Sequence, residues 1–505
     1  MPRLLVHQLL EHSADTRPNA EFVVTPDARC SYANIEAEAN RIANLLIGLG
    51  VEAGDRVALL ARKSPLYVAS YYGVLKARGV VVPLSNASSA TSVADYVSDC
   101  GAQGLIVGPG LERIVQRAGD RLDGLGWLLS PNAERLTSVD TQRIAWDASG
   151  PAQRPGLDVD SNELACIVYT SGTTGRPRGA MLSHANIAAN TAAIVDYLEL
   201  AHTDRALLVL PLSYVYGMSV LNTHAQVGGC VVVESRFQYP NIALDTLEAE
   251  ACTGFAGVPS SFAILLNRST FLDRPLPSLR YLTQAGGAMS PAMTRRLMAA
   301  TNSARIFIMY GATEAAARLA YLAPEQLPQR LGSIGRAIAG VDLRVVGDDG
   351  QECAADHVGE LVARGPNIMR GYWNAPQETA EVLDAAGYHT GDLARRDNDG
   401  FLYIVGRSRD MLKVGGHRIA AREIEDTISE HEAVHEVAVI GEPDELLGAK
   451  LRAFVVLRGG HLADAKELSK FLAERLPGFK VPKLWDFVDA LPKNEAGKVV
   501  KMELG

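Results

Sequence analysis

The sequence lacks the features that mark several common classes of protein. None of its apolar runs reaches the ~18 residues that a membrane span needs, and the apolar stretch at residues 4–6 is soon interrupted, which predicts an amphipathic helix and not a signal peptide. Lys and Arg number 49 against 58 Asp and Glu, a net charge of −9 that argues against general affinity for nucleic acid. We therefore expect a cytoplasmic protein without a membrane span or a nucleic-acid partner.

Cysteine is scarce, and its spacing matches no metal site. The six cysteines form no C-x-x-C pair, and none has a histidine at the spacing of a zinc site. Reduced and mostly buried thiols are the expected state. The chain also contains no internal repeat and no low-complexity tract.

The first 160 residues alternate between helical and strand patterns. Residues 32–49 and 67–77 have apolar residues at helical spacing, and residues 56–60 and 79–84 read as buried strands. Such alternation predicts an α/β fold, in which layered and mostly parallel sheets are covered by helices.

After Gly406 the pattern changes. A charged helix at 423–428, short strands at 434–440 and 453–457, and a helix at 465–476 indicate a separate α+β unit of modal domain size. We therefore divide the chain into a large N-terminal domain, residues 1–406, and a small C-terminal domain, residues 407–505.

The strongest chemical signal is the segment 169–179, which directly follows an apolar strand at 164–168. It holds three glycines, four Ser or Thr hydroxyls and two arginines. Glycines let backbone N–H groups crowd around an anion, and Arg178 adds a charge that pairs with phosphate. The order of residues differs from the G-x-x-x-x-G-K-[ST] loop, so this is a phosphate-binding loop of another kind.

Five further motifs follow in a fixed order: Tyr310-Gly311-Ala312-Thr313-Glu314, Gly371-Tyr372-Trp373, Tyr388-His389-Thr390-Gly391-Asp392, Gly406-Arg407-Ser408-Arg409-Asp410 and Asn494-Glu495-Ala496-Gly497-Lys498. With the loop, they make the chain resemble the adenylate-forming superfamily of acyl-CoA synthetases, stand-alone adenylation enzymes and firefly luciferase. The resemblance covers nearly the whole chain. It implies activation of an organic acid by ATP to an acyl-adenylate, followed by transfer of the acyl group to a thiol.

The resemblance implies a role for each motif in nucleotide binding. Glu314 would hold Mg²⁺, Thr313 would bond the α-phosphate, and Asp392 would accept the ribose hydroxyls. Lys498 would be the catalytic lysine between the attacking carboxylate and the α-phosphate. The implied ATP-binding residues are Thr170, Ser171, Gly172, Thr173, Thr174, Arg178, Gly287, Ala288, Tyr310, Asp392 and Arg407.

The resemblance also implies a mobile C-terminal domain, which turns at Arg409. One orientation would present Lys498 to ATP. The other would present the loop containing Lys413, Gly415 and Gly416 to the tunnel of the thiol substrate.

The predicted acid pocket departs from that of amino-acid-activating relatives. The segment 211–217 lacks the aspartate that would pair with a substrate ammonium, and a buried ammonium without a partner is costly. We expect a non-amino acid of medium size or with an aromatic ring, in a pocket formed by Tyr214, Tyr216, Met218, Ser219, Val258 and Gly286. Arg178 stands where the family usually has lysine, which keeps the charge but changes its shape.

Several functions remain open at this point. Coenzyme A is the first candidate for the thiol acceptor, and the phosphopantetheine arm of an acyl carrier protein in a natural-product pathway is the second. A nucleotide-binding protein without catalysis is a third reading, against which the presence of Lys498, Glu314, Asp392 and Arg407 argues. Nothing in the sequence requires a fourth, a luciferase-like oxygenase.

Overall fold

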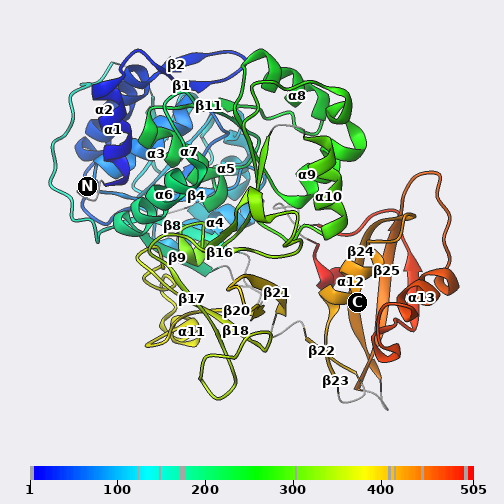
Figure 1. The fold of residues 1–505 in the computed structure, drawn as a ribbon. Coiled ribbons are helices and arrows are strands. Elements are labelled where there is room, and N and C mark those ends of the chain that lie inside the picture. Colours follow the sequence, from blue (N-terminus) through cyan, green and yellow to red (C-terminus); the bar gives the residue numbers. More distant parts are fainter. Residues whose placement is uncertain are drawn as a thin grey trace.

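The computed structural model describes residues 5–122, 124–146, 149–170, 178–301, 304–407, 411–414, 417–444, 448–493 and 499–504 (Figure 1). Within these residues, two large sheets build most of the N-terminal part, and three smaller sheets follow later in the chain. The mixed α/β class, with a large N-terminal part and a smaller C-terminal domain, agrees with the sequence prediction. No helix in the described ranges is both long and apolar enough to cross a membrane.

A seven-stranded sheet carries the predicted phosphate loop at one edge. Its order is β7 (Gln142–Ala145), β6 (Trp127–Ser130), β5 (Gly104–Val107), β3 (Arg56–Leu60), β4 (Val80–Leu84), β8 (Leu164–Thr170) and β9 (Arg178–Ser183). All neighbours are parallel except β8 and β9. The predicted loop therefore falls between β8 and the antiparallel edge strand β9.

A nine-stranded sheet forms the second large layer. Its order is β16 (Arg336–Ala337), β15 (Ala320–Leu322), β14 (Arg305–Tyr310), β13 (Tyr281–Gln284), β12 (Gly254–Gly257), β10 (Arg205–Leu208), β11 (Cys230–Val233), β1 (Glu21–Val24) and β2 (Arg29–Ser31). The central strands are parallel, and β2, β15 and β16 pair antiparallel.

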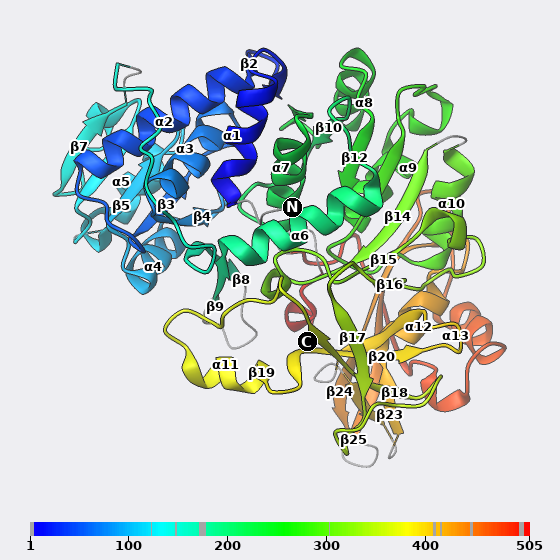
Figure 2. The ribbon, with the colours of Figure 1, turned by 60° about the vertical axis from the view of Figure 1, so that its left-hand side comes forward.

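Helices fill the space between the two sheets. Figure 2 shows α1 (Val6–Thr16), α6 (His184–Leu198) and α7 (Val215–Val227) in this middle layer. The largest hydrophobic core cluster contains residues of these three helices, of α2 (Tyr32–Gly48) and α3 (Pro65–Lys76), and of both sheets. The outer faces are covered by α4 (Ala90–Cys100) and α5 (Glu112–Ala118) on one side, and by α8 (Pro240–Ala249), α9 (Pro259–Arg268) and α10 (Pro291–Ala300) on the other.

The later part of the chain forms three smaller sheets. The first contains β17 (Asp342–Val346), β18 (Val358–Arg364), β19 (Leu383–Asp384), β20 (Gly387–Arg396) and β21 (Leu402–Arg407), with α11 (Pro376–Val382) beside it. The C-terminal unit contains β22 (Met411–Val414), β23 (His417–Ala420), α12 (Ala421–Ile428), β24 (Val434–Asp444), β25 (Gly448–Leu457), α13 (Ala465–Ala473) and β26 (Leu484–Phe487). Arg407 ends β21 in the first of these sheets, and the domain division after Gly406 stays a prediction.

The predicted elements are present, with shifts at their ends. The strand at 56–60 is confirmed without change, and the strand at 434–440 runs four residues further, to Asp444. The helix predicted to reach residue 476 ends at Ala473, and a turn follows it before Pro477, in which the Leu476 N–H donates to the Leu472 carbonyl oxygen at 2.7 Å. All six cysteines are free, and four of them are buried, as expected.

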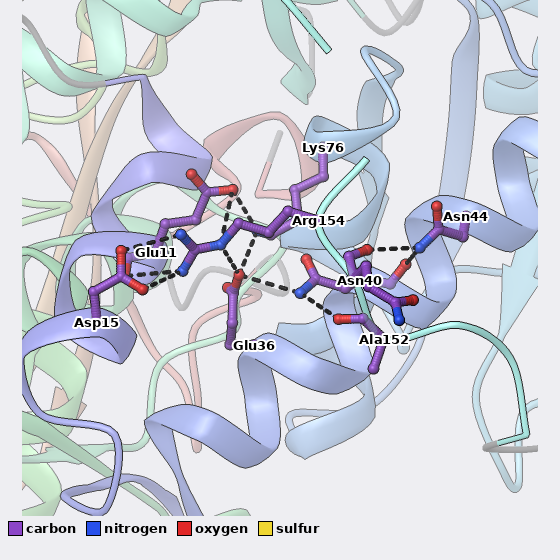
Figure 3. A network of polar contacts seen from close by, with 9 residues as sticks. Glu11, Asp15, Glu36, Asn40, Asn44, Lys76, Ala152 and Arg154 are labelled. Carbon is purple, nitrogen blue, oxygen red and sulfur yellow. Dashed lines mark hydrogen bonds and ion pairs between the residues drawn. The ribbon is translucent and has the colours of Figure 1, made fainter. Parts of the chain in front are cut away.

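A polar network, buried at Lys76 and Glu36 but exposed at Asp15, joins α1, α2 and α3 to the connection at 150–156 (Figure 3). Lys76 donates to Glu11 at 2.5 Å and to Glu36 at 2.9 Å, and its side chain is only 1% exposed. Arg154 donates from Nε to Glu36 at 2.7 Å and forms an ion pair with Asp15. Arg154 therefore holds this connection against the helices.

Candidate active site

Asp392 is the centre of a hydrogen-bonded group formed by three of the predicted ATP-binding residues. The Tyr310 hydroxyl donates to Asp392 Oδ2 at 2.5 Å, and Arg407 Nε donates to Oδ1 at 2.9 Å. Asp392 is 8% exposed, and burial together with this carboxylate raises the pKa of Tyr310, so the phenol stays a donor. Each carboxylate oxygen keeps a lone pair for a further donor.

Glu314 lies in the 3₁₀ turn Thr313–Ala315, which begins three residues after the end of β14. Its Oε1 accepts a hydrogen bond from the Tyr372 hydroxyl at 2.7 Å, and its carbonyl oxygen accepts one from the Met369 N–H at 2.7 Å. Burial, followed by the charge of Glu314, raises the pKa of Tyr372. Tyr372 belongs to a predicted motif, but its contact with Glu314 was not predicted.

The ends of the phosphate loop lie near this pair. Thr170 and Arg178 are partners across β8 and β9, and the Thr170 hydroxyl donates to the Arg178 carbonyl oxygen at 3.4 Å. The Arg178 guanidinium lies 5.6 Å from the centre of the Tyr372 ring. Of the other predicted loop residues, Ser171, Gly172, Thr173 and Thr174 lie outside the described residues.

The chemistry of these residues fits a magnesium ion bound together with a nucleotide. Mg²⁺ in such sites takes one or two carboxylates and completes its shell with phosphate oxygens and water. Glu314 supplies a carboxylate with one oxygen fixed by the Tyr372 hydroxyl, and the Arg178 guanidinium lies over the ring of the same tyrosine. The assignment of Glu314 as metal ligand stays a prediction.

The segment that contains the predicted ATP-binding residues Gly287 and Ala288 follows β13. Gly286, Gly287 and Ala288 are exposed, and Gln284 fixes their course by donating to the Gly287 carbonyl oxygen at 2.7 Å. Gly286 has φ +82°, and a Cβ on it would lie 3.0 Å from Val258 Cγ1. Two of the predicted acid-pocket residues, Gly286 and Val258, are thus neighbours.

A cavity of about 20 Å³ lies between α6, α7 and the nine-stranded sheet. Tyr216 and Ser219, both predicted, line it from α7, whereas Tyr214 caps the helix and Met218 is buried in the core on another helix face. Thr283, Met309 and Arg318 also line it and were missed. Arg318 follows the Tyr310–Glu314 motif closely, but no periodicity marks it as inward-facing.

The remaining predicted residues belong to the C-terminal unit. Lys498, Arg409, Gly415 and Gly416 lie outside the described residues, and only the backbone of Lys413 is described, within β22.

Comparison with known protein families shows to which family the chain belongs. The sequence model of the AMP-binding enzyme family matches residues 10–373, and that of the AMP-binding enzyme C-terminal domain matches residues 423–498. The chain belongs to the AMP-binding enzyme family. The family matches agree with the resemblance carried by the sequence motifs.

Known members of this AMP-binding family match along their whole length. A feruloyl-CoA synthase from Amycolatopsis sp is 34% identical and covers 96% of both chains. An indoleacetate–CoA ligase from Aromatoleum aromaticum is 31% identical and covers 97% of this chain and 96% of its own. The structure of the anthranilate CoA ligase AuaEII with anthranoyl-AMP has a TM-score of 0.91 at 27% identity, covering 100% of this chain and 97% of that chain. The protein is an AMP-forming acid–thiol ligase.

Changing Glu314 tests the metal assignment in this enzyme. Glu314→Gln removes a charge that binds Mg²⁺, so acyl-AMP formation at limiting Mg²⁺ should fall by ~10²-fold. Tyr372→Phe is the matched control, because it removes only the hydrogen bond that orients Glu314, and it should cost about tenfold. Pyrophosphate release measured across a Mg²⁺ titration reports both. Wild-type turnover of Glu314→Gln at limiting Mg²⁺ would show that Glu314 is not the ligand.

Proposed function

We propose that this ligase activates a non-amino carboxylic acid, medium-sized or aromatic, with MgATP and transfers the acyl group to coenzyme A. The observation that carries the proposal is the convergence of Tyr310 and Arg407 on the Asp392 carboxylate. A buried carboxylate held in this way is suited to receive the two ribose hydroxyls of a nucleotide.

In the first half-reaction, a carboxylate oxygen of the acid bonds to the α-phosphorus of ATP, and pyrophosphate leaves. Arg407 lies beside Asp392 and would steady the ribose and the α-phosphate. Arg178 and the loop would bind the departing pyrophosphate, and Lys498 would offset the charge where the acid meets the phosphate. Mg²⁺ held by Glu314 would neutralise charge on the phosphate oxygens.

In the second half-reaction, the thiol loses its proton and its sulfur bonds to the acyl carbon, while AMP leaves. We propose that the C-terminal domain turns at Arg409, so that Lys498 withdraws and the segment with Lys413, Gly415 and Gly416 faces the thiol. The division of the chain into 1–406 and 407–505 belongs to this proposal. Free cysteines throughout are consistent with work in the reducing cytoplasm.

The cavity supports the choice of acid. None of its lining residues is Asp or Glu, whereas Arg318 is among them. A substrate ammonium would therefore lose its hydration without gaining a counter-ion. The names of the relatives, which point to ferulic, indoleacetic and anthranilic acids, favour an aromatic acid.

This reading predicts no ATP–pyrophosphate exchange with the standard α-amino acids, and clear exchange with some acid that lacks an α-amine. The measurement is isotope exchange over both sets of acids at saturating MgATP. Strong exchange with leucine or proline alone would overturn the assignment of the acid class.

An acyl carrier protein is the second candidate for the thiol acceptor. The described part of the C-terminal unit exposes several large apolar side chains, which a protein partner could cover, namely Leu462, Phe479, Leu484 and Phe487. The deciding experiment is a pyrophosphate-release screen over a panel of acids, with coenzyme A or candidate carrier proteins as acceptors. Thioester formation with coenzyme A supports the first proposal, and thioester formed only on a carrier replaces it.

A further inference from the structure

Arg318 places a buried cation at the cavity beside the predicted acid pocket. The residue is 3% exposed and lines the cavity together with Tyr216 and Thr283. Its guanidinium lies 4.3 Å from the centre of the Tyr216 ring. Removing a guanidinium from water is unfavourable unless an anion balances it.

The described neighbours of this guanidinium are neutral. Arg318 Nε lies 3.2 Å from Met309 Sδ, and Nη1 donates to the Ala317 carbonyl oxygen at 3.1 Å. Among the residues that the structure describes, no carboxylate oxygen lies within 4.0 Å of it. Even the partly exposed Arg205 pairs with two carboxylates, those of Glu21 and Glu250, so the anion that would balance Arg318 is missing from the described chain.

The backbone before Arg318 is strained and firmly held. Ala316 and Ala317 have φ of 53° and 126°, values that residues other than glycine rarely adopt. The buried Asn190 accepts from the Arg318 N–H at 3.2 Å, and both Asn190 and Asn367 donate to its carbonyl oxygen at 2.8 Å. Strain that the surroundings maintain in this way is typical of functional positions.

We propose that Arg318 determines specificity by pairing with a second carboxylate on the acid substrate. The inference rests on the proposed function and narrows its substrate class to dicarboxylic acids, one carboxylate being activated and the other bound by Arg318. A guanidinium pairs with a carboxylate through two parallel hydrogen bonds. The Tyr216 ring lies beside it to contact the body of the acid.

The cavity as it stands has room for about one water molecule. Met309, which contacts Arg318 Nε through its sulfur, must therefore move when the acid enters. Methionine is unbranched and has three rotatable bonds, so it adapts at little cost. The same movement frees the Nε–H to donate to the incoming carboxylate.

The test compares acids that differ only in the second carboxylate. The first pair is hexanedioic acid, a diacid, and its monoacid counterpart hexanoic acid. The second is benzene-1,4-dicarboxylic acid and its monoacid counterpart 4-methylbenzoic acid. Wild type should favour at least one diacid by ~10²-fold in kcat/KM for pyrophosphate release, because the site is built for the group that the monoacid lacks. Arg318→Met should abolish this ratio and raise activity on the monoacid. The preferred diacid should also raise the thermal unfolding temperature of the wild type and not that of Arg318→Met.

Arg305→Met is the matched control, since Arg305 also lies over an aromatic ring, 5.2 Å from the centre of Phe307, but is paired with the exposed carboxylates of Glu199 and Glu325. It should leave the diacid ratio unchanged. If Arg318→Met does not fold, the test uses the ratio of kcat/KM for diacid over monoacid in the wild type and in Arg318→Lys. Lysine keeps the charge but not the two parallel hydrogen bonds, so this ratio should fall in Arg318→Lys. A wild type that prefers every monoacid, or a ratio unaffected at position 318, overturns the inference. Absence of pyrophosphate release with every acid instead overturns the proposed function.

Discussion

Lys498→Ala should lower the rate of acyl-AMP formation by ~10²–10³-fold, the usual cost of removing one preorganised charge from a transition state. The reason is that the carboxylate and the α-phosphate are both negative and meet at one point. The second half-reaction has no such meeting of anions. The variant should therefore still convert chemically synthesised acyl-AMP to thioester at a rate close to that of the wild type.

Gly415→Leu is the complementary variant. In the proposed thioester-forming orientation, the absence of a side chain at position 415 leaves room for the pantetheine arm. Leucine there should block thioester formation and leave acyl-AMP formation nearly normal. Both half-reactions are measured separately on each variant. Equal damage to both half-reactions in both variants would rule out domain alternation as the way this enzyme divides its chemistry.

The sequence could predict the fold because local pattern and topology agree over most of the chain. Buried strands such as β3 are runs of apolar residues bounded by polar turns, and their alternation with helices requires a parallel sheet. Boundaries are harder to predict: α13 ends at Ala473, four residues before Pro477, and no residue pattern marks that position. The order in which the strands lie side by side depends on long-range packing, which periodicity does not encode.

The candidate site could be predicted only where its residues belong to motifs. Tyr310, Asp392 and Arg407 come from three motifs, and the structure joins them by hydrogen bonds. The bond from Tyr372 to Glu314 joins residues 58 positions apart, and no spacing rule indicates it. Arg318 could not be predicted as a site residue, because an arginine outside any motif usually lies at the surface. Its burial is a tertiary property.

The contribution of Lys76 to stability also could not be predicted from the sequence. Lys76→Met should lower the free energy of unfolding of the N-terminal part by about 3 kcal/mol. At the end of α3 the residue resembles an ordinary cation at a helix C-terminus, yet its side chain is 1% exposed and bonds to both Glu11 and Glu36 (Figure 3). Methionine fills a similar volume but leaves the two carboxylates facing each other, with Arg154 as the nearby cation. Removing one partner of a buried ion pair is among the most destabilising of single changes, and the pairing of Arg154 with Glu36 offsets only part of the loss.

Urea unfolding at neutral pH measures this effect as a lower midpoint with an unchanged slope. Arg121→Met is the control, because Arg121 forms a single ion pair with Asp95, in which the two side chains are 51% and 50% exposed, and such surface pairs contribute about 0–1 kcal/mol. The double change of Lys76→Met with Glu36→Gln should recover part of the loss, since it removes one of the carboxylates left facing each other. A midpoint for Lys76→Met equal to that of Arg121→Met would mean that the network contributes no more than a surface ion pair, and that packing alone holds α1, α2 and α3 together.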